Sequence, residues 1–178
     1  THYTRSMDGG QSFEAPKRLS TVTDQDMSGV IHGGFASAAA FGTMASAPDG
    51  SVHVYWIDTR HMKPDSDSGA LYGSVSRDDG KTFATDKPLI ETSVCPCCQL
   101  TAVANSKSEI VVGSQQVEKD SFRAATVMTL SRSDEVIHER QSIGGAPWQI
   151  NGCPLKPTVV AVQGTKVFAA AHNGGEAT

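Results

Sequence analysis

The sequence predicts an all-β protein built from four-stranded antiparallel units. Three observations lead to this prediction: short apolar runs of strand length alternate with polar turns, one decorated turn recurs along the chain, and helix-forming segments are nearly absent. The Ala-rich run 35–47 is the segment that most resembles a helix, but it contains Gly42 and carries no charge. We therefore expect it to form a strand and a loop of small residues.

The recurring turn is the most specific feature of the sequence. It reads SRDDGKTF at residues 76–83 and SMDGGQSF at residues 6–13. Its aspartate can accept hydrogen bonds from backbone N–H groups later in the turn, its glycine can adopt positive φ, and its aromatic ring can fill the base of the hairpin. An eroded third copy is expected to begin at Ser131 and to include Asp134. The characteristic positions are Ser6, Asp8, Gly10, Ser12 and Phe13 in one full copy, and Ser76, Asp78, Gly80, Thr82 and Phe83 in the other.

The strand-like runs fall into consecutive sets of about four, which is the repeating blade of a β-propeller. We predict one propeller domain over residues 1–178, with blade boundaries near residues 30, 94 and 146. Two complete and two partial blades would cover about half of a ring of roughly six, so we expect the chain to be part of a longer protein or to be completed by a second chain. The expected strands are 15–19, 31–38, 51–57, 70–75 and 87–91, then 99–104, 110–116, 124–130 and 136–142, and finally 153–163 and 165–171.

The composition is that of a globular domain with a small acidic excess. The 178 residues are 38% apolar and 19% charged, which is enough to bury a core. The formal net charge of −4 argues against nucleic acid as a partner, because phosphate binding needs a basic face. No run of about 18 apolar residues occurs, so no membrane span is expected.

The four cysteines lie in two short segments, with Cys95, Cys97 and Cys98 in the first and Cys153 in the second. Each segment comes just before the innermost strand of a blade, so the repeat brings the two together beside the propeller axis. In an exported protein this arrangement favours a disulfide between Cys153 and either Cys97 or Cys98. Two alternatives stay open, namely a soft-metal site in which thiolates bind copper or zinc, and a reactive thiol pair.

The turn pattern S-x-D-x-G-x-[ST]-[FW] resembles the Asp-box, or BNR repeat, of sialidase-like β-propellers. A closer resemblance is to exported bacterial sialidase-like proteins that carry H-G-F-x-S, W-x-D-x-R, C-x-C-C-Q and W-x-I-x-x-C-P segments in this order. In this chain the four segments are residues 32–37, with one extra glycine, 56–60, 95–99 and 148–154. The resemblance implies an extracytoplasmic protein, which is periplasmic, bound at the cell surface or secreted.

The resemblance also indicates where a sialidase-type site would lie. Sialidases hold the sialate carboxylate with three arginines, and the loop before the Asp-box carries the catalytic acid. By position, Asp65 or Asp67 would be that acid, and Arg60 and Arg123 are the candidate arginines. The expected inner strand around His32 contains no arginine, and the family's tyrosine nucleophile with its glutamate partner is not identifiable.

Each candidate residue also has a structural explanation. Asp58 and Arg60 could pair with each other instead of facing a central pocket, and His32 could be a packed inner-strand histidine instead of a ligand. Asp65 and Asp67 could be solvated turn residues. We therefore expect a non-catalytic binding or assembly module that works with a protein partner or with the rest of the propeller, and a carbohydrate is the candidate small ligand. A sialidase-type glycoside hydrolase, and copper or zinc handling through the cysteines, are the alternatives.

Overall fold

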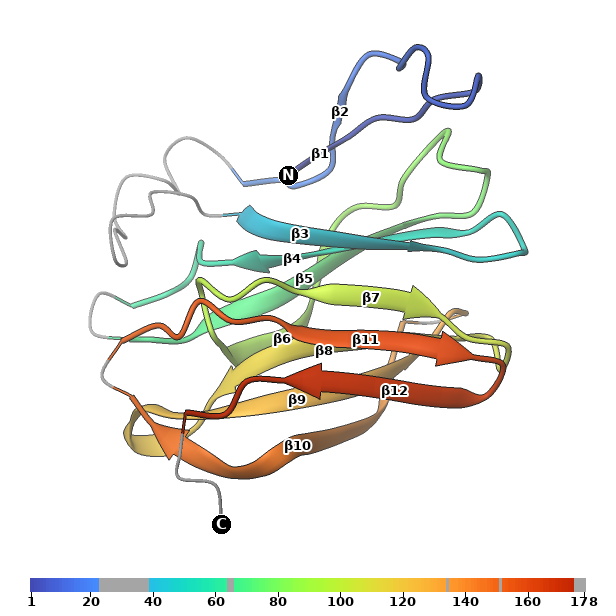
Figure 1. Ribbon diagram of the computed structural model, residues 1–178. Coiled ribbons are helices and arrows are strands. Elements are labelled where there is room, and N and C mark those ends of the chain that lie inside the picture. Colours follow the sequence, from blue (N-terminus) through green and yellow to red (C-terminus); the bar gives the residue numbers. More distant parts are fainter. Residues whose placement is uncertain (23–38, 64–65, 134, 151, 175–178) are drawn as a thin grey trace.

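Antiparallel β-strands make up most of the part of the chain that the structure describes (Figure 1). The computed structural model describes residues 1–22, 39–63, 66–133, 135–150 and 152–174. Within these residues, one turn of 3₁₀-helix at Lys119–Ser121 is the sole helical element, and no helix has the length and apolar character needed to cross a membrane. The predicted all-β class is confirmed.

The strands pair with their neighbours in the chain. A hairpin of β1 (His2–Tyr3) and β2 (Lys17–Arg18) comes first, and a hairpin of β11 (Thr158–Gln163) and β12 (Lys166–Ala171) comes last. Between them lies one eight-stranded sheet. Its strands are β3 (Ala39–Ser46), β4 (Val52–Asp58), β5 (Gly69–Ser76), β6 (Lys87–Val94), β7 (Thr101–Ala104), β8 (Glu109–Val117), β9 (Phe122–Ser131) and β10 (Ile137–Gln149).

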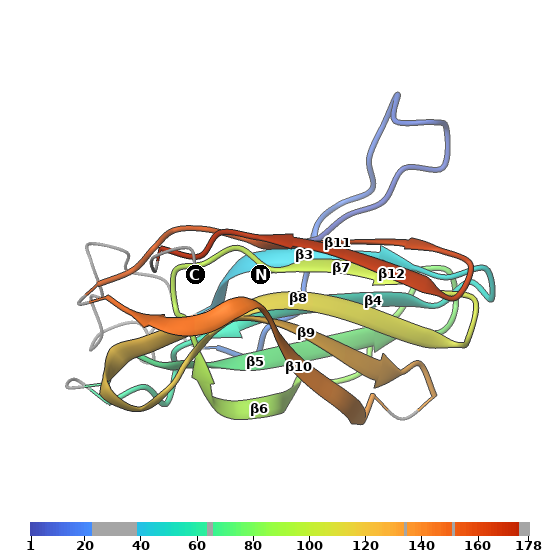
Figure 2. The ribbon, with the colours of Figure 1, turned by 60° about the horizontal axis from the view of Figure 1, so that its bottom comes forward.

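The eight-stranded sheet consists of two four-stranded units, β3–β6 and β7–β10. Successive strands pair along their length within each unit, whereas the two units are joined by one residue pair, Val94 with Gln116. The leading strands β3, β7 and β11 gather on one side of the molecule, and the trailing strands β6 and β10 lie on the opposite side (Figure 2). This is the arrangement of consecutive blades in part of a β-propeller.

Apolar side chains fill the spaces between neighbouring units. Tyr55 and Leu71 of the first unit belong to one buried cluster with Ile110, Val112 and Met128 of the second unit. A second cluster joins the β1–β2 hairpin to the other face of β4 and β5. Because strands β4, β5 and β8 are covered on both faces, their side chains are buried almost without alternation.

The innermost strand of the β3–β6 unit differs from its predicted position. We predicted this strand at residues 31–38, but the strand that pairs with β4 is β3 at Ala39–Ser46, and residues 23–38 lie outside the described residues. Both runs consist mainly of glycine, alanine and serine, so their composition does not separate them, and the pairing with β4 selects the strand. The run 35–47 contributes a strand to the sheet, as its lack of charge and its glycine predicted.

The turns at residues 6–13 and 76–83 share the same internal hydrogen bonds. Asp78 accepts the backbone N–H of Thr82 at 2.9 Å and the Thr82 hydroxyl at 2.6 Å. Asp8 accepts the same two donors of Ser12 at 2.9 and 2.6 Å. Gly80 has a φ of 76°, the left-handed conformation that the turn requires. The two turns are therefore equivalent in structure as well as in sequence.

The aromatic position and the third turn show where the repeat has diverged. The Phe83 ring packs against Tyr3 with the ring centroids 4.7 Å apart, whereas Phe13 is 64% exposed. In the third turn the Ser133 N–H donates to the Ser131 hydroxyl at 3.2 Å, as the N–H two residues after the leading serine does in the full copies. Ser133 thus occupies the aspartate position, while Asp134, which we expected in this third copy, lies outside the described residues.

Candidate functional site

The described pocket candidates and the cysteines come together at one end of the four-stranded units. Antiparallel pairing places the end of β4, the start of β5, the end of β6 and the starts of β7 and β9 at this end. The turns at residues 6–13 and 76–83 lie at the opposite end, since they follow β1 and β5. His32 and Asp65 fall outside the described residues.

The end of β4 carries an arginine held between two carboxylates. Arg60 donates through Nε and Nη2 to the two oxygens of Asp58 at 2.9 and 2.7 Å, and Nη2 also donates to Asp86 at 2.7 Å. Asp58 is 1% exposed and accepts a further hydrogen bond from the Trp56 indole N–H at 3.1 Å. The guanidinium carbon lies 4.3 Å from the centre of the Tyr72 ring. Strand packing and ring stacking therefore hold this arginine in one position.

The electrostatics of this group favour the charged forms of Arg60 and Asp86. Burial disfavours the charged form of Arg60, but its hydrogen bonds to Asp58 and Asp86 outweigh burial and raise its pKa. Burial likewise works against the charged form of Asp86, yet the bonds from Arg60 and Thr21 hold its pKa below the usual range. One guanidinium thus faces two carboxylates, and little of its charge remains for a ligand.

A cleft of about 650 Å³ opens beside this ion-paired group. It lies between the loop after β4 and the adjoining strands β5 and β6. Cationic and anionic side chains both line it, and the exposed aromatic face that a sugar-stacking platform needs is covered, because Arg60 lies over Tyr72. Its lining includes His61, Lys63, Ser68, Pro88 and Glu91.

The second candidate arginine is bonded to the candidate acid. Arg123 is 2% exposed and donates through Nη2 to Asp67 at 3.0 Å and to the Gly152 carbonyl at 2.9 Å. Asp67 also accepts the Ser121 hydroxyl at 2.8 Å. Partial burial works to raise the pKa of Asp67, but the hydrogen bonds from Ser121 and Arg123 outweigh it and hold the pKa below its ordinary value. The remaining nitrogens of Arg123, Nε and Nη1, are buried without a hydrogen-bond partner.

The cysteines form one compact cluster next to Arg123. Cys97 and Cys153 are joined by a disulfide, with their Cα atoms 6.4 Å apart, as the positions of the two segments predicted. Cys95 and Cys98 are thiols, and their sulfur atoms lie 3.0 Å apart. The Cys153 sulfur is 3.6 Å from that of Cys95 and 3.7 Å from that of Cys98. Cys95, Cys97 and Cys98 are buried, and Cys153 is half-buried.

The two thiols differ in their hydrogen bonding and therefore in their acidity. The Cys98 thiol donates to the Cys95 sulfur, which lowers the pKa of Cys95, and burial opposes this effect. The Cys97 backbone N–H and the Arg123 charge further favour the Cys95 thiolate. The same hydrogen bond and burial raise the pKa of Cys98. The pair can thus share one proton between two sulfurs, and the negative charge stays on Cys95.

Sequence reasoning missed three participants in these groups, namely Asp86, Ser121 and Tyr72. Asp86 reaches Arg60 across 26 residues of chain, and Ser121 reaches Asp67 across 54. Neither is part of a local motif, so only the pairing of the strands that follow them, β6 and β9, could have located them.

Comparisons with known proteins identify the fold. No family model matches the sequence, and no curated protein matches it significantly. Among solved structures, the Hadza microbial sialidase Hz136 superposes with a TM-score of 0.56 at 18% identity. The fold is sialidase-like. The alignment covers 78% of this chain but 31% of that sialidase, so the chain spans about a third of its length. A likeness at this identity shows the fold alone.

Proposed function

We propose that this chain is part of an extracytoplasmic Asp-box propeller that serves as a non-catalytic binding or assembly module. The observation that carries this proposal is the pairing of both candidate arginines. Arg60 is bonded to Asp58 and Asp86, and Arg123 is bonded to Asp67. A sialate carboxylate would have to displace Asp58 and Asp86 before it could bind the Arg60 guanidinium, which would cost the charge-assisted bonds already formed, and Arg123 is only 2% exposed.

The acidity of Asp67 supports the same proposal. A general acid at neutral pH needs a raised pKa so that it carries a proton to the leaving group. Its bonds from Ser121 and Arg123 hold the pKa of Asp67 low, so it is ionised at neutral pH. This carboxylate is better suited to positioning Arg123 than to donating a proton.

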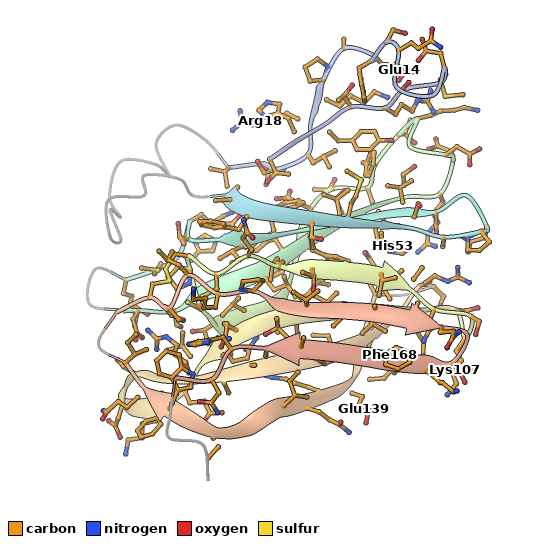
Figure 3. The ribbon with its side chains drawn as sticks, viewed as in Figure 1. Glu14, Arg18, His53, Lys107, Glu139 and Phe168 are labelled. Carbon is orange, nitrogen blue, oxygen red and sulfur yellow. A yellow bond between two sulfur atoms is a disulfide. The ribbon has the colours of Figure 1, made fainter. Side chains whose placement is uncertain are left out.

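The assembly role is supported by the last hairpin. One face of β11–β12 packs against the β7–β10 unit, while Val159 and Phe168 on the other face are 47% and 53% exposed. Phe168 projects from β12 in Figure 3. Contiguous exposed apolar side chains on a strand pair indicate a covering partner. We assign this face to a neighbouring unit of the same propeller, because apolar side chains fill the space between the β3–β6 and β7–β10 units in the same way.

The extracytoplasmic location is supported by the Cys97–Cys153 disulfide, because such bonds persist in oxidising compartments. The polar cleft beside Arg60 is the candidate site for a small ligand.

A hydrolysis assay separates this proposal from the glycoside hydrolase alternative. We expect no release of sialic acid from a generic α-sialoside, and no difference between the native protein and an Asp67→Ala variant. Turnover that Asp67→Ala or Asp65→Ala abolishes would establish the hydrolase instead.

Sedimentation velocity tests the assembly role. We expect the 178-residue chain to self-associate reversibly through its uncovered face, and Phe168→Ser to weaken this association, whereas a matched change on the opposite hairpin, Phe13→Ser, should have little effect. A chain that stays monomeric over a wide concentration range would contradict the assignment of this face to a partner.

A further inference from the structure

The cysteine cluster has the geometry of a site for a soft metal ion. The sulfurs of Cys95, Cys98 and Cys153 form a triangle with sides of 3.0, 3.6 and 3.7 Å. A point equidistant from the three lies about 2.0 Å from each, and a shift of a few tenths of an ångström would reach the zinc–thiolate distance of about 2.3 Å. Two of the three residues are fully buried, so the site is shielded from bulk water.

Arg123 provides an independent indication that an anionic group belongs here. It is 2% exposed, its Nη2 is bonded to Asp67 and Gly152, and its Nε and Nη1 are buried without a hydrogen-bond partner. A guanidinium rarely keeps two buried nitrogens unpaired, because unpaired buried donors are costly. The charge of Arg123 and a side-chain hydrogen bond from it already favour the Cys95 thiolate, so negative charge on this sulfur, in a free or a metal-bound thiolate, suits these buried donors.

The donor set and the charge select Cu(I) over Zn(II). Thiolates are soft ligands that bind both ions, but a structural zinc site takes four ligands. No imidazole or carboxylate of the described residues joins the three sulfurs within ligand distance. Two thiolates with one Cu(I) carry a single negative charge, which lies beside the guanidinium of Arg123 that is also paired with Asp67.

We propose that Cys95 and Cys98 bind one Cu(I) ion as a pair of thiolates, with the Cys153 sulfur as a neutral third contact. The Cys97–Cys153 disulfide stays intact and fixes the two segments. Two Cu–S bonds form, the one proton that the two sulfurs share leaves to solvent, and the copper keeps its oxidation state. The chain would thus hold copper near the starts of β7 and β11, apart from the cleft beside Arg60.

Anaerobic competition with a chromophoric Cu(I) chelator tests this site. The protein is used as isolated, and non-reducing mass spectrometry first verifies the disulfide. We expect one copper per chain, and X-ray absorption should show a coordination shell of sulfur. Cys95→Ser and Cys98→Ser should each abolish the ability of the protein to keep copper in competition with the chelator. Met7→Leu, which removes an exposed thioether, should leave copper binding unchanged. Arg123→Gln should weaken binding by about 10–100-fold, and Arg123→Lys by less, because it keeps the charge.

Four outcomes would overturn the proposal. These are loss of copper to the chelator, binding that survives both serine substitutions, a shell of oxygen or nitrogen atoms, and binding that requires reduction of the disulfide. Circular dichroism of each variant distinguishes loss of the site from loss of the fold. If a serine variant unfolds, the sulfur count of the native protein by X-ray absorption still decides the assignment.

Discussion

At the scale of single residues, Asp78 and Asp8 are carboxylates whose side-chain hydrogen bonds all come from their own turns. Asp78 takes the Ser76 hydroxyl at 2.8 Å in addition to the two donors of Thr82. These bonds favour the ionised carboxylate, the Thr82 hydroxyl most of all, and they lower the pKa of Asp78 well below its usual range. The charge of this half-buried carboxylate thereby stabilises the turn, because protonation weakens an acceptor that three donors use.

The pH dependence of unfolding tests this role of Asp78. Its folded-state pKa lies below the unfolded value of about 4, so its contribution to stability is present above that pH and is lost as the pH falls through the folded-state value. Asp78→Asn should lower the urea midpoint at pH 7, and the difference from the native protein should shrink at pH 3. Asp79→Asn, which removes a neighbouring charge, is the control. Equal differences at both pH values would contradict this role.

At the scale of elements, arginines connect one turn to the next around the propeller. Arg5 donates to the carbonyl of Asp79 at 2.7 Å, and Arg77 donates to the carbonyls of Arg132 and Ser133 at 3.1 and 2.8 Å. Each guanidinium thus leaves its own hairpin and binds the backbone of the following one. These contacts supplement the apolar clusters between the units at the end of the molecule opposite the cysteines.

Replacing Arg77 tests how much this connection contributes. Arg77→Gln should destabilise the chain by about 1 kcal/mol, because two hydrogen bonds from a charged but solvent-exposed donor are lost. The melting temperature should fall by about 2–4 °C for a chain of this size. Lys107→Gln, at another exposed position, should leave it unchanged. If the variant had the same melting temperature as the native protein, the apolar clusters alone would hold the units together.

The accuracy of the sequence-based strand assignments also varies by element. Strands β4, β5, β8 and β9 were predicted closely, since their apolar runs are bounded by polar turns. β3 was misplaced because its surroundings are uniformly small residues, and β10 extends to Gln149 through a stretch that contains two glycines and a proline. The closeness of the cysteine segments could be predicted from the repeat, whereas the pairing of Arg60 with Asp86 could not, because it depends on how β4 and β6 lie across β5.

At the scale of the whole molecule, a disulfide and an ion pair join units that share few backbone hydrogen bonds. Both links lie at the end of the units that carries the cysteines. The β3–β6 and β7–β10 units pair through one residue of each. The disulfide from Cys97, which precedes β7, to Cys153, which precedes β11, ties the second unit to the final hairpin. Asp67 and Arg123 connect the first unit to the second at the same end. The arginine contacts between turns at one end, and the disulfide with the Asp67–Arg123 pair at the other, therefore hold consecutive units together.

Removing the disulfide tests this view of the molecule. The bond closes a loop with a sequence separation of 56, so its loss should lower the free energy of unfolding by about 4 kcal/mol if its effect is mainly on the entropy of the unfolded chain. The double variant Cys97→Ser with Cys153→Ser is preferred, because a single variant leaves a sulfur that can pair with Cys95 or Cys98. Cys95→Ser is the matched control, since it removes a buried sulfur from the same cluster without opening the loop. Urea unfolding of both variants, with the disulfides mapped by non-reducing mass spectrometry, measures the difference. If the double variant were no less stable than the control, the disulfide would be dispensable for the fold. Packing and the Asp67–Arg123 pair would then hold the units together at the end that carries the cysteines.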